Sequence, residues 1–486
     1  MALVAVPSQG AVPAETKSTE PLPPVIVTPC DPWPRPYFLG GGLRKVRPYH
    51  FTYNTYCKER WRGRKLIDIF STEFRERTLA YYKGAIEKGL VTVNGQPTTP
   101  ETVILNGQMI SHTLHRHEPP VTSQLIGIVH EDNDMIVINK PAGVPVHPAG
   151  RYNYNSVVEI MRADRGYCWN PMPCNRLDRL TSGLMFVGKH AEAAAKMGVQ
   201  LKSRTIKKEY LARVIGEFPT GDVICDQPIL QISPKLGLNR VRANGKEART
   251  IFKRVAYYPP ESKHGGVVED TRTDVEKNRD AKMAWKAMNG YSIVRCLPLT
   301  GRTHQLRVHL QFLGHPITND PIYCNQGVFG PDLGAGDSTG DKDEDIITRL
   351  SRMGKEEVAE AKAYHEELME EYNKKKAEKM SGEFCEICDT PLYTDPGPHE
   401  LGIYLHARKY ECAEGNWSYE TDIPAWALPP HGHEDVSAAI LQADSTTLTE
   451  EIEKLKLHEL ENESEAGQVQ EVKEFRRSLW AHPGDM

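Results

Sequence analysis

The stretch from Cys174 to Phe186 sets the strictest conditions on the fold of this chain. It places one carboxylate, Asp178, between two arginines, Arg176 and Arg179, and then passes through small turn residues into an apolar run at 184–187. Positive neighbours favour the charged form of a carboxylate, and small turn residues permit a tight backbone. The chain must therefore present an anionic group in a basic setting, which suits a nucleophile or base acting on a phosphate-bearing substrate.

The length and charge pattern describe a protein of several parts. At 486 residues, the chain is long enough for two or three domains and at least one sizeable core. The net charge of −5 argues neither for nor against a nucleic-acid partner. Basic clusters at 60–65 and 202–208 contrast with acidic runs after residue 330, which indicates a basic functional body with acidic appendages.

The cysteines and the first thirty residues bear on the compartment. Ten cysteines without regular spacing predict a reducing environment rather than a disulfide framework. The first thirty residues have neither an apolar signal region nor an Arg-rich amphipathic pattern, and no apolar run reaches membrane-spanning length. We expect a cytoplasmic protein, with a nuclear or mitochondrial share left open.

Shifts in composition divide the chain into a folded body with appendages. The segments are a disordered Pro-rich arm at 1–48, a small α/β module at 49–118, a main body at 119–326 with a charged insertion at 257–284, a second charged insertion at 327–384, a returning segment of the body at 385–429 and an acidic tail at 430–486.

The small module has a recognisable order of elements. We predict helices at 66–70 and 79–88, a strand that ends at an Asn-Gly turn, and a further strand at 103–110. This order resembles the S4 RNA-binding module, especially the segments Gly-Leu-Val-Thr-Val-Asn-Gly and Leu-Asn-Gly-Gln-Met-Ile, with Arg75 and Arg77 as a loose match to that module's arginine. Any small α/β domain could show the same periodicity. The preceding aromatics at 49–61 suit either base stacking or packing against a neighbouring domain.

Four further residues of the body are candidates for a functional site. Lys140 and His147 lie in a Pro-rich rigid loop, which could line a site or merely cap a sheet. Tyr210 lies in an alternating strand, where a tyrosine usually packs in a core. Arg302 stands at a strand-to-helix turn, with Thr300 or Thr303 as the expected helix cap.

Cys385 and Cys388 form a single Cys-x-x-Cys pair. A closed zinc site needs four ligands, so the pair alone is a weak signal. Cys412, His399 and His406 could complete such a site, and we rate zinc as the less favoured interpretation.

Four ordered motifs resemble the RluA-type RNA pseudouridine synthases. They are the Lys-Pro-Ala-Gly loop at 140–143, Arg-Leu-Asp-Arg-x-Thr-Ser-Gly at 176–183, Lys-x-Tyr at 208–210 and Gly-Arg-x-His-Gln-x-Arg-x-His at 301–309. The resemblance implies an α+β protein with the pseudouridine synthase fold, a mixed and mainly antiparallel sheet with flanking helices. It implies an isomerase that needs no cofactor.

The resemblance also implies roles for individual residues. Asp178 would be the catalytic aspartate, Tyr210 would stack on the flipped uracil and could act on its C5 proton, and Arg302 would pair with Asp178. Whether Asp178 attacks C1′ or abstracts a sugar proton stays open. The other expected substrate contacts are Arg176, Arg179, Thr181, Lys140, His304, Gln305 and Arg307.

The substrate is suggested by one departure from the family pattern. Asn175 stands where many members have histidine, which resembles the eukaryotic branch that modifies position 32 of the tRNA anticodon loop. The alternatives are a ribosomal-RNA pseudouridine synthase and a non-catalytic RNA-binding or chaperone protein on the same fold.

Overall fold

The computed structural model describes residues 30–74, 78–203, 205–234, 236–260, 290–352 and 380–430. Contacts divide the chain into two compact units. Among the described residues, the smaller unit contains 30–31, 49–116 and 385–389, and the larger one contains 32–48 and those within 117–384 and 390–430. Arg75, Arg77, most of the insertion predicted at 257–284 and the acidic tail after residue 430 lie outside the described residues.

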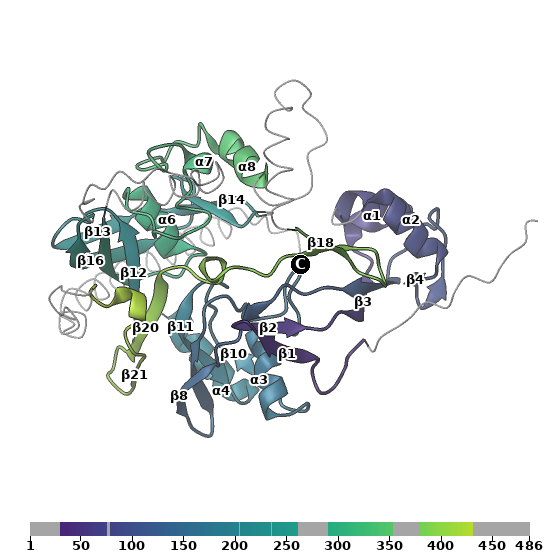
Figure 1. Ribbon diagram of the computed structural model, residues 1–486, viewed down its shortest axis with the longest axis horizontal. Helices are drawn as coiled ribbons and strands as arrows, with labels where there is room; N and C mark the ends of the chain where they lie inside the picture. Colours follow the sequence, from purple (N-terminus) through teal and green to yellow (C-terminus); the bar gives the residue numbers. More distant parts are fainter. Residues whose placement is uncertain are drawn as a thin grey trace, which may run out of the picture. The chain divides into compact units, whose positions relative to one another are not determined.

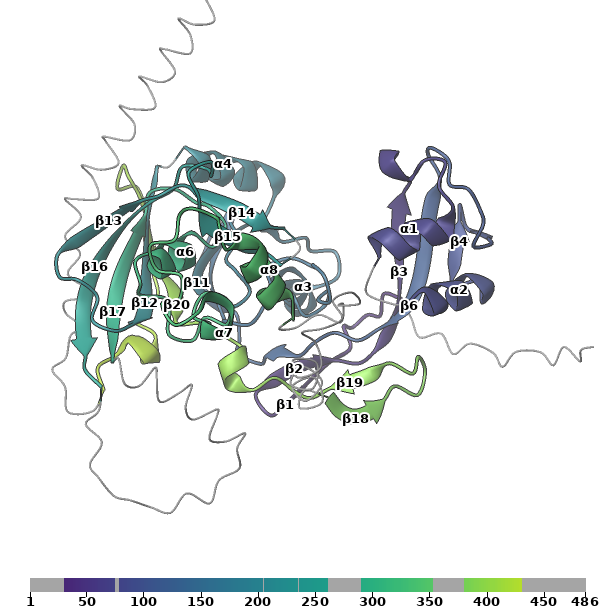
Figure 2. The same cartoon turned by 90° about the horizontal axis from the view of Figure 1, so that it is seen from above.

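The smaller unit is a four-stranded antiparallel sheet with two helices packed on it (Figure 2). Its core gathers Trp61, Leu66 and Phe70 with Tyr82 and Ile86, because each helix turns one apolar face to the sheet. In sheet order the strands are β3 (Tyr49–Tyr56), β6 (Met109–Arg116), β4 (Val91–Val93) and β5 (Gln96–Pro97), and the helices are η1 (Glu59–Trp61), α1 (Leu66–Glu73) and α2 (Leu79–Glu87).

One strand of this unit differs from the prediction. The strand expected at 103–110 is wrong in position, because β6 begins only at Met109 and Val103 makes an isolated bridge with Lys65. The Asn-Gly turn lies inside the predicted range, and Gly107 has a φ of +78°. A left-handed glycine turns the chain and cannot continue a strand, so the ladder starts after the turn.

The arm predicted to be disordered through residue 48 also differs. Residues 37–46 form a hairpin of β1 (Tyr37–Gly40) and β2 (Leu43–Val46), and β2 pairs with β7 (Val121–Thr122). Two glycines with positive φ provide its turn. The hairpin belongs to the larger unit.

The larger unit is built on a ten-stranded mixed sheet (Figure 1). All of its strand pairs are antiparallel except β11 with β20. The main order is β13 (Asp222–Asp226), β16 (Arg249–Tyr258), β17 (Tyr291–Pro298), β12 (Ile206–Ile215), β20 (Leu405–Cys412), β11 (Ser182–Gly188), β9 (Met135–Lys140) and β8 (Gly127–Glu131), with β10 (Met172–Pro173) beside β11 and β21 (Ser418–Glu420) beside β20.

The apolar run at 184–187 is the centre of this arrangement, because alternate side chains of β11 enter two different cores. Leu184 and Phe186 pack with α4 (Ala191–Lys202), whereas Met185 and Val187 pack with α3 (Val157–Arg165) on the other face. Helix α6 (Gln305–Phe312) packs its Leu306 and Leu310 on β12, β16 and β17.

The insertion predicted from residue 327 is wrong for its first part. Val328 of α7 (Gln326–Phe329) and Ile346 of α8 (Asp343–Arg352) are buried, in one core with the hairpin of β14 (Ile229–Ser233) and β15 (Leu238–Val241). Figure 1 shows α7 and α8 close to β14. The remaining elements are β18 (Met380–Phe384), β19 (Pro391–Tyr393), η2 (Pro398–Glu400) and η3 (Ala425–Ala427). Among the described helices, none has the length and apolar character to span a membrane.

A buried ion network joins the central strands. Glu209 of β12 accepts from Arg295 of β17 at 2.8 Å and from Arg408 of β20 at 2.8 Å. The β12–β20 register shifts between Glu209 and Tyr210. Because a bulge re-aims the next side chain, the network and the bulge together fix the direction of Tyr210.

Candidate active site

A cavity of about 570 Å³ lies over the centre of the large sheet. It is lined by the loops at 145–149 and 174–181, by the segment 298–307 that leads into α6, and by Tyr210 and Tyr410. The lining holds five basic side chains, Arg176, Arg179, Lys208, Arg302 and Arg307, together with His147 and His304. Asp178 is the one carboxylate among the described residues of the lining. A basic cavity of this size suits an anionic small-molecule group.

The turn that carries Asp178 is fixed by backbone bonds. The Thr181 N–H donates to the Asp178 carbonyl at 3.1 Å, and the Gly143 N–H donates to the Arg179 carbonyl at 2.8 Å. The Asp178 side chain is 31% exposed and faces the cavity. Its carboxylate therefore remains reachable for a ligand although the main chain around it is held in place.

Arg307 is the ion-pair partner of Asp178. Its Nη1 donates to Asp178 Oδ2 at 3.1 Å, while Nε and Nη2 bind both oxygens of Asp320 at 2.6 and 3.0 Å. Burial alone would lower the pKa of Arg307, but Asp320 and Asp178 outweigh it and raise that pKa. The bidentate pair with Asp320 fixes the guanidinium plane, so one nitrogen is held toward Asp178.

His304 is the second group near the carboxylate. Its Nε2 lies 3.5 Å from Asp178 Oδ2, and its Nδ1 lies 2.9 Å from the Tyr323 hydroxyl. That hydroxyl accepts from the Asn239 N–H, so its proton is available to His304 Nδ1. Burial, followed by Arg307, lowers the pKa of His304. We therefore assign the neutral tautomer with its proton on Nε2, facing Asp178.

The predicted pair of Arg302 with Asp178 is wrong. Arg302 Nε donates to the Glu247 carbonyl at 2.8 Å, and its backbone N–H donates to Gln305 Oε1 at 3.0 Å. Helix α6 begins after His304, which has a φ of +59° and no side-chain cap, instead of at Thr300 or Thr303. Arg302 thus precedes the helix, and Arg307 within the helix reaches the carboxylate.

Gln305 and Lys140 were expected to contact substrate, but both serve the protein itself. The Gln305 amide donates to the Arg249 carbonyl and to Thr250 Oγ1, each at 3.0 Å. Lys140 is fully buried and donates to the carbonyls of Pro141, Val144 and Arg179. Burial lowers the pKa of Lys140 to about 7, which Asp178 partly opposes. Lys140 positions the loop under Asp178 and does not line the cavity.

Gln305 still lines the cavity, and so do the other expected contacts apart from Lys140. Arg176 is exposed, and the Arg179 guanidinium lies 5.6 Å from the centre of the Tyr152 ring. The Thr181 hydroxyl is buried and has no hydrogen-bond partner among the described residues. A buried polar atom of this kind favours a partner, which a ligand in the cavity could supply.

Tyr210 enters the cavity from β12 and is paired with a second tyrosine. Its hydroxyl lies 2.6 Å from that of Tyr410 on β20. Burial raises the pKa of Tyr210 to about 12, although the bond to Tyr410 opposes the rise. Asn175 also contacts the Tyr410 side chain, and its Oδ1 accepts from the Phe186 N–H at 2.9 Å. Asn175 thus ties the Asp178 loop to β11 and to the tyrosine pair.

Sequence reasoning missed Tyr410 and Asp320. Tyr410 lies 200 residues after Tyr210, and its own segment carries no motif. Asp320 follows α6 without a pattern of its own, although a buried arginine favours a carboxylate partner, because an uncompensated buried charge is costly. The arginine-rich motif at 301–309 was the signal from which such a partner could have been sought.

Comparisons with known proteins agree with this geometry. A family model described as RNA pseudouridylate synthase matches residues 134–312. The chain is 46% identical to the "tRNA pseudouridine(32) synthase, mitochondrial" of Saccharomyces cerevisiae, over 80% of this chain and 78% of the relative. It is 36% identical to human "Pseudouridylate synthase RPUSD2", over 80% and 74%. To the "tRNA pseudouridine(31) synthase" of Saccharomyces cerevisiae it is 32% identical, over 80% and 96%.

These matches define the class. The chain belongs to the RluA-type family of RNA pseudouridine synthases. It is accordingly an isomerase, and the predicted fold with a mixed, mainly antiparallel sheet and flanking helices is confirmed.

Proposed function

We propose that the protein converts uridine 32 of the tRNA anticodon loop to pseudouridine, with Asp178 as the catalytic residue. The observation that carries the proposal is the placement of Asp178, a single carboxylate held by Arg307 in a basic cavity. The tRNA and the position are supported by the relative named for position 32, which is more similar to this chain than the relative named for position 31.

The chemistry needs one ionised carboxylate and no external group. The N1–C1′ bond of uridine breaks, the uracil turns within the cavity, and a C5–C1′ bond forms as the C5 proton is lost and N1 gains one. Arg307 donates to the Asp178 carboxylate and orients it for either attack at C1′ or removal of a sugar proton. A target base must leave its stack to reach a partly buried carboxylate, which calls for base flipping.

Tyr210 is proposed to stack on the displaced base. Its ring lies at the cavity wall beside Asp178, and a pKa of about 12 keeps its phenol protonated near neutral pH. A protonated phenol is a poor base, which favours stacking over removal of the C5 proton. Arg176, Arg179 and Arg302 line the same cavity and are proposed to hold the neighbouring phosphates.

The smaller unit is proposed to bind RNA as an S4-like module. Its two helices precede a strand and hairpin turn, and β3 exposes Tyr53 and Tyr56, which could stack on bases.

For localisation, we propose a mitochondrial share of the protein in addition to the predicted cytoplasmic one. The reason is that the relative with 46% identity is named as mitochondrial.

Substitution Asp178→Asn tests the proposal directly. Wild-type protein incubated with a tRNA transcript should produce pseudouridine at position 32, mapped by sequencing after chemical labelling. The variant keeps the side-chain shape but lacks the charge, so its rate should fall by more than about 10³-fold while tRNA binding persists. Product at position 31 or only in ribosomal RNA would correct the substrate, and turnover by the variant would remove Asp178 from its role.

A further inference from the structure

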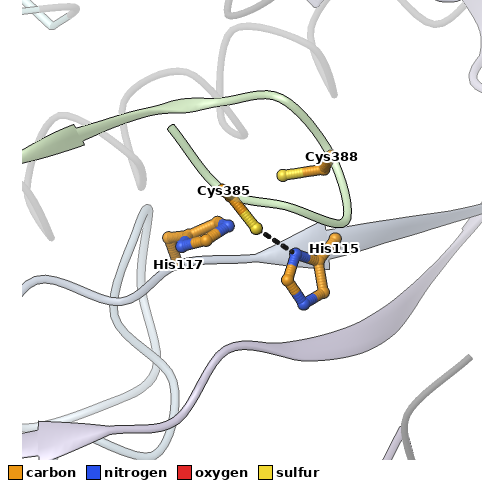
Figure 3. Close-up of side chains that lie close together, drawn as sticks. All are labelled: His115, His117, Cys385 and Cys388. Carbon is orange, nitrogen blue, oxygen red and sulfur yellow. Dashed lines mark hydrogen bonds between the residues drawn. The ribbon is translucent and has the colours of Figure 1, made fainter. Parts of the chain in front are cut away.

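Four side chains of the types that can bind a metal ion lie close together, and none of them takes part in the isomerase chemistry. They are His115, His117, Cys385 and Cys388, whose ligand atoms all lie within 4.8 Å of one another (Figure 3). Cys385 Sγ lies 3.4 Å from His115 Nδ1. His115 is on β6 of the smaller unit, which also contains residues 385–389, and His117 follows two positions later along the chain.

The distances and the donor types fit a tetrahedral zinc site. Zinc bonds of about 2.3 Å to sulfur and about 2.0–2.1 Å to nitrogen place neighbouring ligand atoms about 3.3–3.8 Å apart. Ligand atoms gathered within 4.8 Å need only small side-chain rotations to reach those separations. Two thiolates and two imidazoles form one of the common structural zinc sets, whereas calcium and magnesium prefer oxygen ligands.

The backbone supports the same arrangement. The Cys385–Cys388 segment follows β18 as a tight turn, closed by the Asp389 N–H donating to the Cys385 carbonyl at 2.8 Å, and Asp389 has a φ of +53°. His115 is buried and Cys385 is half-buried, so water is partly excluded from the cluster. A turn of this kind brings both sulfurs to one side, as Figure 3 shows.

The partners that the sequence suggested for the cysteine pair are wrong. His406 on β20 binds Ser182 Oγ at 2.8 Å and Thr421 Oγ1 at 2.7 Å, so both of its nitrogens are used elsewhere. Cys412 is buried at the end of the same strand, and His399 lies in η2. The histidines of the cluster precede the cysteines by about 270 residues, so no local spacing could reveal them.

We propose that His115, His117, Cys385 and Cys388 bind one zinc ion as a closed structural site. Four protein ligands leave no open position for water or substrate, which separates this site from catalytic zinc centres. The ion would tie the 385–389 turn to the end of β6. The proposal does not depend on the substrate, because it concerns none of the residues that line the cavity.

Metal analysis of the full chain tests the site. Protein purified under reducing conditions should contain one equivalent of zinc by mass spectrometry of the metal. After zinc removal, titration with Co²⁺ alone should give the strong visible bands of a tetrahedral ion and a thiolate-to-cobalt charge-transfer band. Cys388→Ser and His115→Asn should each lower Co²⁺ affinity by more than about 100-fold. Loss of a group that only orients a ligand already weakens metal binding by up to about 100-fold, so loss of the ligand itself should weaken it more.

Cys168→Ser is the matched control, because Cys168 is an exposed cysteine outside the cluster. It should bind metal as the wild type does. The wild-type Co²⁺ spectrum decides the question even where a ligand variant fails to fold. A spectrum without thiolate bands, zinc content unchanged in both ligand variants, or a Cys385–Cys388 disulfide in reduced preparations would overturn the proposal.

Discussion

Arg307 stands between two carboxylates, and its loss should affect both. Asp320 is fully buried and shares both of its oxygens with Arg307, while Asp178 receives one nitrogen. Removing one partner of a buried ion pair costs about 3–5 kcal/mol, because the other charge stays uncompensated. Arg307→Met should therefore lower the free energy of unfolding by that amount, measured by urea denaturation at pH 7.5. Its residual activity at a permissive temperature should also be low, since Asp178 loses its partner.

Arg302→Met provides the contrast within the same motif. Arg302 is partly exposed and donates to a backbone carbonyl, so its loss should change stability by less than about 0.5 kcal/mol. Equal losses in the two variants would show that Arg307 is not held between the two aspartates in solution.

The sequence could predict where these two arginines lie, but not which of them pairs with Asp178. The motif at 301–309 correctly brought both to the cavity of Asp178. Which of them pairs with the carboxylate depends on where α6 begins, and the left-handed His304 delays that start beyond both threonines that were expected to cap it. Strained backbone of this type is fixed by the surrounding fold, so propensity alone could not assign the partner.

The strands β11 and β20 come unusually close where they pair in parallel. Gly183 has a φ of +114°, and a Cβ there would lie 2.2 Å from the Ala407 carbonyl oxygen. Gly183→Ala must therefore separate the two strands, and we expect a loss of more than about 3 kcal/mol in unfolding free energy by urea denaturation. Activity should fall with it, because Asp178 lies five residues before this contact.

Gly198→Ala is the control for this change. Gly198 lies within α4 and an added Cβ would meet nothing within 4 Å. The same substitution there should stabilise the protein by about 0.5–1 kcal/mol, because alanine favours a helix. A tolerated Gly183→Ala would mean that β11 and β20 are not paired in this register.

The sequence predicted buried segments here, but not how β11 and β20 pair. Alternation and the apolar run at 184–187 were enough to predict buried segments, and the returning segment after residue 385 was expected to rejoin the body. That β20 lies between β12 and β11 was not predictable. More than 200 residues separate it from β11, and the contact is decided by packing rather than by local pattern.

For the molecule as a whole, the resemblance predicted an α+β protein, but composition placed the edges of its folded parts poorly. Residues 37–46 and 327–352 were assigned to a disordered arm and a charged insertion, yet both contribute buried side chains, such as Leu43 and Ile346. Short amphipathic elements with many charges have little apolar content of their own. They fold by covering an existing core, which a window of sequence does not reveal.

Two buried neutral histidines should make the larger unit sensitive to acid. His309 donates from Nε2 to the Gln227 carbonyl and accepts from Thr250, and His406 bonds to Ser182 and Thr421. Burial lowers the pKa of each histidine from 6.5 to about 4. The unfolded chain therefore binds more protons between these values, so stability is fully present above pH 6.5 and is lost as pH falls toward 4.

The size of this loss follows from the two pKa values. At pH 5 each histidine should cost about 2 kcal/mol of unfolding free energy relative to pH 7.5. Urea denaturation at pH 7.5, 6 and 5 should show that decline in the wild type, on top of the contribution of the carboxylates. The double variant His309→Gln with His406→Gln should start less stable at pH 7.5 but lose about 4 kcal/mol less on acidification. Parallel declines in the two proteins would mean that neither histidine is held neutral by the fold.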